Sequence, residues 1–145
     1  MMNEREKLLR EICGEDANAF VETRERAINT TPLFPLRQIL PAVVERLKHL
    51  LMEDGKLELA ASVDGLQVYD RCRCGTDYCA TVYTQPRPGG GYGPTHRNLV
   101  FWNADTEHTT ILDVVNNGIA CIELLDDDES VRRLVEALPE DAPTD

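Results

Sequence analysis

Three of the five cysteines lie within eight residues, in the segment Cys72-Arg73-Cys74-Gly75-Thr76-Asp77-Tyr78-Cys79. Thiol groups this close together can bind zinc, form a redox pair or supply a nucleophile. The β-branched and aromatic residues on both sides of the segment predict that it forms the tip of a β-hairpin. No complete catalytic or cofactor signature accompanies it, so this tip is the first candidate site.

The cysteine spacing departs from the usual zinc knuckle, in which two residues separate the paired thiolates. Cys72 and Cys74 share one face of a strand because side chains alternate. The competing interpretation is a set of small buried core cysteines, since free cysteine is among the most buried residue types. A zinc site would use Cys72, Cys74 and Cys79, with a fourth ligand from His96, His108 or Cys121 and His96 as the first to examine.

Two hairpin registers lead to different chemistry at this tip. A four-residue loop pairs Cys74 with Cys79 and brings all three thiols together, whereas a three-residue loop pairs Cys74 with Tyr78 and sends Cys79 to the opposite face. The second register is favoured because it gives one apolar face, which consists of Val68, Cys72, Cys74, Tyr78, Ala80 and Val82.

A glycine- and proline-rich stretch over residues 86–98 contains three consecutive glycines, Gly89 to Gly91. Phosphate-binding loops run from a strand into a helix N-terminus. This stretch runs between two predicted strands and lacks the GK[ST] signature, so it is interpreted as a long hairpin loop. The alternative is a binding loop in which Tyr92, His96 and Arg97 contact a partner.

Asp113 and Glu123 interrupt apolar alternation, which makes them the best candidates for carboxylates with a shifted pKa. The structural alternative places each at a sheet edge or beside an arginine. No histidine has an interpretable spacing to a cysteine or serine, so no catalytic residue is predicted.

Apolar periodicity predicts helices in the first half of the chain and strands in the second. The helices are expected over 3–13, 17–28 and from residue 37 or 38 to Gly55, with Pro41 in the first turn of the third and residues 57–61 open between strand and helix. The strands are expected at 66–73, 78–84, 98–103, 109–116 and 119–125, followed by a helix over 129–138 that Pro139 ends.

The dipeptide Asn117-Gly118 predicts a two-residue type I′ turn, because both residues tolerate positive φ. Such a turn pairs Val115 with Ala120, Asp113 with Ile122 and Ile111 with Leu124 on one face, and puts Val114, Cys121, Leu112 and Glu123 on the other. This hairpin is expected inside the sheet, and Trp102 is expected in the core.

Together these elements predict a single α+β domain over residues 1–145: N-terminal helices, an antiparallel β-meander of about five strands and a C-terminal helix. Residues 139–145 are expected to form a disordered acidic tail.

The net charge of −11 is concentrated at the C-terminus, where residues 126–145 hold eight acids and two arginines, a net of −6. This balance argues against nucleic acid and suits a basic protein partner. The N-terminus lacks an apolar signal-peptide core and no run approaches the length of a membrane helix, so the protein is expected in the cytoplasm without a membrane partner. The oligomeric state is left open.

The segments Arg71–Thr81 and Gly91–Asn98, followed by Ile-Leu-Asp-Val-Val and Ile-Glu-Leu-Leu, resemble small bacterial proteins of unknown function. The resemblance covers roughly residues 66–125. It implies that the cysteine tip and the glycine-rich loop belong to one structural unit, and it implies no activity.

The leading functional hypothesis is a non-enzymatic protein-binding module, in its sharpest form an inhibitor or immunity-type protein that covers a basic partner. No cofactor is required by this hypothesis. The alternative is a small zinc- or thiol-dependent enzyme or sensor that uses Cys72, Cys74 and Cys79 with His96.

Overall fold

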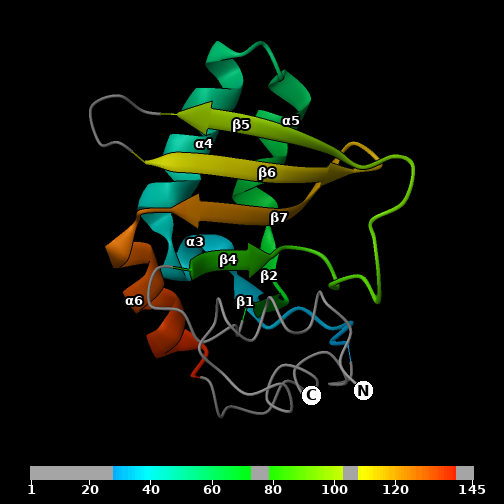
Figure 1. Ribbon diagram of the computed structural model, residues 1–145. Coiled ribbons are helices and arrows are strands. Elements are labelled where there is room, and N and C mark those ends of the chain that lie inside the picture. The colour runs from blue at the N-terminus through cyan, green and yellow to red at the C-terminus, as the bar shows by residue number, and fades with distance from the viewer. Residues whose placement is uncertain (1–27, 73–78, 103–107, 140–145) are drawn as a thin grey trace, which may run out of the picture.

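The computed structural model describes residues 28–72, 79–102 and 108–139 (Figure 1). The predicted helix over 3–13, nearly all of that over 17–28, the turn of the cysteine hairpin and most of the predicted tail over 139–145 fall outside these ranges.

Short helices and a two-stranded sheet come first, then a larger sheet and a last helix. In chain order the elements are β1 (Phe34–Pro35), α3 (Leu36–Ile39), α4 (Pro41–Glu53), α5 (Leu57–Ser62), the 3-10 turn η1 (Val63–Gly65), β2 (Gln67–Val68), β3 (Asp70–Arg71), β4 (Cys79–Tyr83), β5 (Arg97–Trp102), β6 (Thr109–Val115), β7 (Gly118–Leu125) and α6 (Asp128–Ala137). Strands β1 and β2 pair with each other, and the larger sheet has the antiparallel order β3-β4-β7-β6-β5. The predicted α+β fold is therefore confirmed.

The described helices, α3 to α6, lie on one side of the five-stranded sheet (Figure 1). Between the two layers the apolar stripe of α4 packs against the strands, with the side chains of Leu47, Val82, Leu112 and Ile122 completely buried. We call this side of the sheet the inner face and the opposite side the outer face. No helix in the part of the chain that the structure describes is long and apolar enough to cross a membrane.

The predicted third helix is in fact two helices, α3 and α4, which Leu40 separates. Pro41 is the first residue of α4, a position where its missing N–H costs nothing and its fixed φ suits a helix. The prediction of one helix from residue 37 or 38 was therefore wrong. The end of α4 agrees with the expectation, because Gly55 follows Asp54 with a φ of +75°. The open segment 57–61 is helical, as part of α5.

The turn between β6 and β7 lies one residue earlier than predicted. Asn116 and Asn117 have φ values of 51° and 64°, and Gly118 already pairs with Val115 at the start of β7. A register shift between Asp113 and Val114 then changes the pairing along the rest of the two strands. The predicted location of the hairpin inside the sheet is correct, but its turn and pairs were wrong.

This register decides which side chains share a face. Asp113 pairs with Cys121 and Ile111 with Glu123, not with Ile122 and Leu124 as predicted. Directly paired residues project from the same face of a sheet. The two carboxylates that the sequence placed on opposite faces are therefore on the same one.

The faces of the cysteine hairpin also differ from the prediction. Asp70 pairs with Tyr83 and Arg71 with Val82, and the Cys72 N–H donates to the Thr81 carbonyl over 2.9 Å. Cys72 is thus opposite Thr81 and not on the buried face of Val82, so the predicted apolar face that contains both residues was wrong. The turn itself, and with it the choice between the three- and four-residue loops, lies outside the described residues.

Trp102 is not in the core. It occupies the last position of the edge strand β5 with 65% of its surface exposed, next to Val100 at 63%. Phe101 and Leu99, on the other side of the same strand, pack against the core and are only partly buried. An edge strand whose residues alternate in this way presents apolar side chains on both faces.

Polar contacts at both ends of α6 connect this helix to the rest of the fold: Asp127 to Arg46 at its start, and Leu138 to Arg71 at its end. The Asp127 carboxylate accepts hydrogen bonds from Ser130 N at 3.1 Å and Ser130 Oγ at 2.8 Å, and it forms an ion pair with Arg46 of α4 at 3.3 Å. Burial alone would raise the pKa of Asp127, but the hydrogen bonds from Ser130 and Arg46 outweigh it and leave the pKa below its ordinary value. At the other end of α6, buried Arg71 donates from Nε to the Leu138 carbonyl at 2.5 Å.

Replacement of the helix cap should show its contribution to stability. We expect Asp127→Ala to lower the free energy of unfolding by about 1–2 kcal/mol, because it removes the cap of α6 and leaves Arg46 without its ion-pair partner. Because the pKa of Asp127 is lowered in the folded protein, the loss should shrink as the pH falls through that pKa. Urea unfolding of the two proteins at several pH values measures both effects.

The matched control is Asp128→Ala, which removes an exposed carboxylate from the first turn of the same helix without removing the cap. Equal losses for the two variants would show that helix-dipole charge, and not capping, carries the stabilisation.

Candidate functional site on the outer face of the sheet

Asp113 is a carboxylate in the middle of the sheet, on β6, with 6% of its surface exposed. His96 approaches it from the chain just before β5, with 2.7 Å between His96 Nε2 and Asp113 Oδ1. A carboxylate can only accept hydrogen bonds, so His96 must carry a proton on Nε2 to donate it. We call Asp113 and the four side chains around it the Asp113 cluster, which consists of Tyr92, His96, Asp113, Cys121 and Glu123.

Cys121 of β7 lies directly opposite Asp113 and is almost completely buried, with 3% of its surface exposed. Its thiol lies close enough to Asp113 and Tyr92 for both to affect its pKa. Burial raises the pKa of the Cys121 thiol well above its ordinary value, and the nearby Asp113 and Glu123 carboxylates raise it further. Only the thiolate is a good nucleophile or metal ligand, so this cysteine is suited to a structural role.

Glu123 is the carboxyl group of the cluster whose pKa is raised towards neutral pH. The pKa of its carboxyl is raised from 4.5 to about 7. The largest cause is its partial burial, and its interaction with the neighbouring Asp113 carboxylate raises the pKa further. The nearby His96 opposes the rise. In the folded protein Glu123 therefore holds a proton at mildly acid pH that an exposed glutamate would already have lost.

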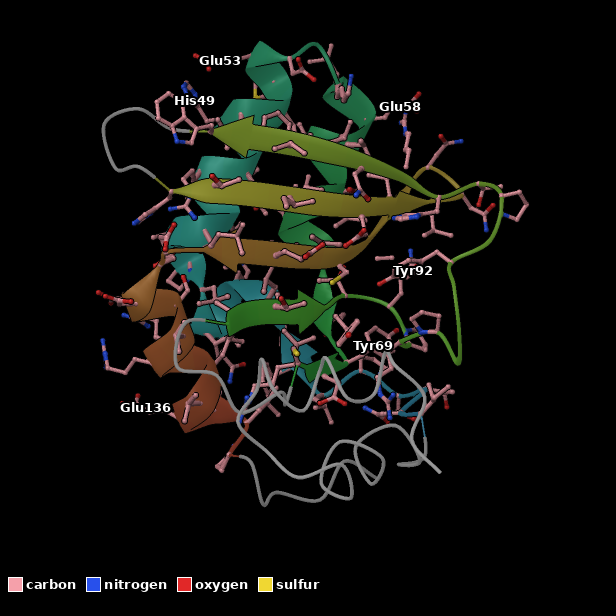
Figure 2. All side chains as sticks on the ribbon, viewed as in Figure 1. His49, Glu53, Glu58, Tyr69, Tyr92 and Glu136 are labelled. Atoms are coloured by element: carbon pink, nitrogen blue, oxygen red, sulfur yellow. The ribbon has the colours of Figure 1, made fainter. Side chains whose placement is uncertain are left out.

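The segment between β4 and β5 carries Tyr92 and His96 to the outer face. It passes the ends of β7 and β6, because β4 and β5 are separated by those two strands (Figure 1). The Tyr92 and His96 rings stack at a centroid distance of 4.7 Å, and Figure 2 shows Tyr92 beside the end of the sheet. Burial raises the pKa of the Tyr92 hydroxyl, and the nearby Cys121 side chain raises it further.

The predicted binding loop is thus divided between two environments. Tyr92 and His96 turn inward and hold the glycine-rich segment against the sheet, while Arg97 begins β5 with an exposed side chain. Whether any of the three contacts a partner stays a prediction.

A second polar group continues the same cross-strand row towards the opposite edge of the sheet, through Tyr83 on β4 to Asp70 on β3. Arg87 Nε lies 3.6 Å from Oδ2 of buried Asp70 on β3. Tyr83 of β4 lies between this pair and Cys121, and burial raises the pKa of its hydroxyl, with further contributions from Cys121 and Cys72. Cys72 is therefore near Tyr83 on the outer face.

The structure does not bring Cys72 and His96 together. Cys72 follows β3 and His96 precedes β5, and these are the two edge strands of the five-stranded sheet. His108 precedes β6 at the end farther from His96, and the side chains of Cys74 and Cys79 lie outside the description. Within residues 28–72, 79–102 and 108–139, no group of three or more His, Cys, Asp or Glu side chains is arranged to hold a metal ion.

Sequence reasoning found Asp113, Glu123 and His96 separately but not their convergence. Cys121 was considered only as a zinc ligand, and Tyr92 only as a partner contact. The buried polar cluster depends on the β6–β7 register and on the path of the loop from β4 to β5. The sequence contains a signal for the register but not for the loop path. In Asn116-Asn117-Gly118 both asparagines can adopt the positive φ of a turn, so the turn could also lie one residue earlier than Asn117-Gly118.

Apolar side chains continue the outer face beyond the cluster. Val100, Ile111 and Glu123 form one cross-strand row, and Trp102, Thr109 and Leu125 form the next. Val100, Trp102 and Leu125 are exposed. The outer face therefore combines a polar, half-buried end with an exposed apolar end.

Comparison with protein-family models, with curated proteins and with solved structures finds no match. The functional argument therefore depends on the residues and the geometry described above.

Removal of the histidine should loosen the glycine-rich segment. We expect His96→Ala to lower the free energy of unfolding by about 1–3 kcal/mol, because buried Asp113 loses a donor and Tyr92 loses its stacking partner. Amide hydrogen exchange should also become faster over residues 85–96. The control His49→Ala, at an exposed histidine of α4, should change neither quantity appreciably, and equal effects would contradict the assigned role.

The Glu123 carboxyl should give the folded protein a specific pH dependence. Because its pKa is raised to about 7 by folding, its contribution to stability is greatest below pH 4.5 and is lost as the pH rises through 7. Glu123→Gln should therefore gain stability relative to the natural protein between pH 5 and pH 8. Urea unfolding across this range measures the difference.

The control Glu58→Gln, on an exposed position of α5, should follow the natural protein at every pH. Parallel stability curves for Glu123→Gln and the natural protein would show that Glu123 titrates like an ordinary surface glutamate.

Proposed function

We propose that this protein is a non-enzymatic protein-binding module that uses the outer face of its sheet to bind a basic partner, as an inhibitor or immunity-type protein would. The observation that carries the proposal is the exposed apolar end of that face, where Trp102 and Val100 are about two-thirds exposed on one strand. Tryptophan is rarely left on a surface in this way and is enriched among residues that dominate binding energy.

The position of these side chains favours binding over simple exposure. The described helices cover the inner face, so none of them would have to move for the outer face to meet another molecule (Figure 1). Leu125 extends the apolar surface across two strands from Trp102, and Ile111 extends it from Val100 towards Glu123. An apolar centre with polar groups at its border is the usual composition of a protein interface.

Charge supports a basic partner. The chain carries a net charge of −11, which attracts cationic surfaces over long distances at moderate salt. Next to the apolar end, Glu123 and Asp113 place two carboxyl groups on the same face, and a cationic side chain over them would favour the ionised form of Glu123.

A zinc- or thiol-dependent activity is a weaker candidate. It would need Cys72 and His96 to meet across the full width of the sheet, and His96 is already hydrogen-bonded to Asp113. Buried Cys121, with its raised pKa, is a poor nucleophile.

A second candidate is acid–base chemistry at Glu123, because a carboxyl group with a pKa of about 7 can donate or accept a proton near neutral pH. It ranks second because Asp113, which interacts with both Glu123 and His96, is buried. A substrate could therefore reach Glu123 and His96 but not the carboxylate between them. Turnover of a substrate that Glu123→Gln abolishes would favour this candidate over a binding module.

The experiment is capture of partners by the immobilised full chain from the native cell lysate at low and high salt. We expect a basic protein that binds at low salt and is weakened by added salt. Trp102→Ser should reduce its binding at least tenfold, because the exposed indole is the largest apolar group on the proposed surface.

The matched control is Val135→Ser, which removes an exposed apolar side chain from α6, away from the outer face. This variant should bind like the natural protein. A specific partner that ignores salt, or one that both variants lose equally, would count against the proposal.

A further inference from the structure

The free edge of the five-stranded sheet is the feature from which more can be inferred. We propose that β5 accepts an extended, lysine- or arginine-containing segment of the basic partner as a sixth strand, paired through the outward-facing backbone groups of Asn98, Val100 and Trp102. This inference depends on the proposed function and adds the way in which the partner binds. In the part of the chain that the structure describes, β5 pairs with β6 alone.

The direction of the backbone groups follows from a hydrogen bond at the other side of the sheet. Cys72 N donates to the Thr81 carbonyl over 2.9 Å, so Thr81 directs its backbone groups towards β3 and the next residue, Val82, directs its groups towards β7. Ile122, the partner of Val82, therefore directs its own groups back towards β4. In an antiparallel strand, consecutive residues direct their N–H and C=O groups to alternate sides. The backbone of Cys121 therefore points towards β6, and that of its partner Asp113 points back towards β7.

The same alternation continues to the edge. Leu112 is the neighbour of Asp113 in β6, so its backbone N–H and C=O point the other way, towards β5, where Leu112 pairs with Leu99. The backbone of Leu99 is thus used inside the sheet. The residues whose N–H and C=O groups point to the free edge are Asn98, Val100 and Trp102.

Within the residues that the structure describes, this edge lacks the usual devices that prevent strand addition. Proteins protect free edges with proline, lysine, β-bulges or very short strands. β5 is six residues long, contains neither proline nor lysine, pairs with β6 in an unbroken register and has Arg97 at its first position as its single charge. Three outward pairs of backbone groups along such a strand match the way extended peptides bind to sheet edges.

The side chains beside this edge suit an alternating partner strand. On the outer face its residues would lie beside exposed Val100 and Trp102, and on the inner face beside partly buried Leu99 and Phe101. Apolar residues of the added strand would thus complete the burial of the inner pair. This contact gives a physical reason for a partner with apolar residues at every second position.

Charge makes a cationic segment the best match. Figure 2 shows Glu53, at the end of α4, and Glu58, in α5, projecting past the β5 side of the sheet. Both side chains are exposed, although Glu53 also contacts His49 at 3.1 Å. An arginine or lysine near the end of the added strand could approach these carboxylates or lie over the open face of the Trp102 ring.

The test uses a synthetic peptide, Lys-Val-Thr-Val-Thr-Val-Lys, and the full chain labelled with nitrogen-15. On addition of peptide to millimolar concentration, we expect amide exchange at Asn98, Val100 and Trp102 to slow about tenfold or more, while Leu99 and Phe101 change little. A peptide with glutamate in place of both lysines should bind at least threefold more weakly.

Two protein variants separate backbone pairing from side-chain contact. Val100→Pro removes an outward N–H at a position where proline leaves the β5–β6 hydrogen bonds intact, and it should weaken peptide binding about tenfold. Val100→Thr keeps the shape and the N–H and should bind within about twofold of the natural protein. If Val100→Pro does not fold, the same comparison is made with the natural protein and a peptide N-methylated at its two threonines, whose N–H groups face β5 when the valines lie on the inner face; this peptide should fail to bind.

The outcomes are distinct. No change in the three outward amides at millimolar peptide, or equal binding of the methylated peptide, overturns strand addition. Capture of a basic partner that Trp102→Ser loses, without protection of these amides, keeps the proposed function and rejects this way of binding. Protection that depends on protein concentration and not on peptide would identify a second copy of the chain as the added strand and would also reject the proposal.

Discussion

The pairing of β6 with β7 is the constraint on which the outer face depends. The turn at Asn116 and Asn117, with the shift between Asp113 and Val114, places Asp113 opposite Cys121 and Glu123 within reach on the same face. A slip by one residue would exchange inner and outer side chains along a strand. The inner face would then receive Asp113, and the apolar contacts of Leu112 and Ile122 with the helices would be lost.

A buried carboxylate in the middle of a sheet is costly unless donors surround it. Here the donor comes from a different part of the chain, because the glycine-rich segment brings His96 to Asp113 and Tyr92 against the His96 ring. The path of that segment is in turn fixed by the strand order, which forces the chain from β4 to the far edge of the sheet. The polar cluster and the topology therefore depend on each other.

Burial in this cluster raises the pKa values of two groups, with different consequences for their chemistry. Cys121 is kept as a neutral thiol, which removes its reactivity, while Glu123 is brought into a range where its charge changes near neutral pH. The exposed apolar residues of the sheet, Val100, Trp102 and Leu125, lie on the same face as this carboxyl. The outer face thus has an apolar part that can provide affinity and an acidic part that can select for positive charge.

The sequence by itself determined the α+β class, the extents of most strands and the last helix, because periods of 3.6 and 2 are local properties of the chain. It also located the end of α4 at Gly55, where only the local backbone matters. It could not determine the faces of β6 and β7, because apolar residues occupy both alternations and asparagine and glycine allow two turn positions. Only the tertiary structure decided that β5 is an edge strand, which leaves Trp102 outside the core, and that Asp113, Glu123 and His96 meet, since both depend on strand order and register between segments far apart in the chain.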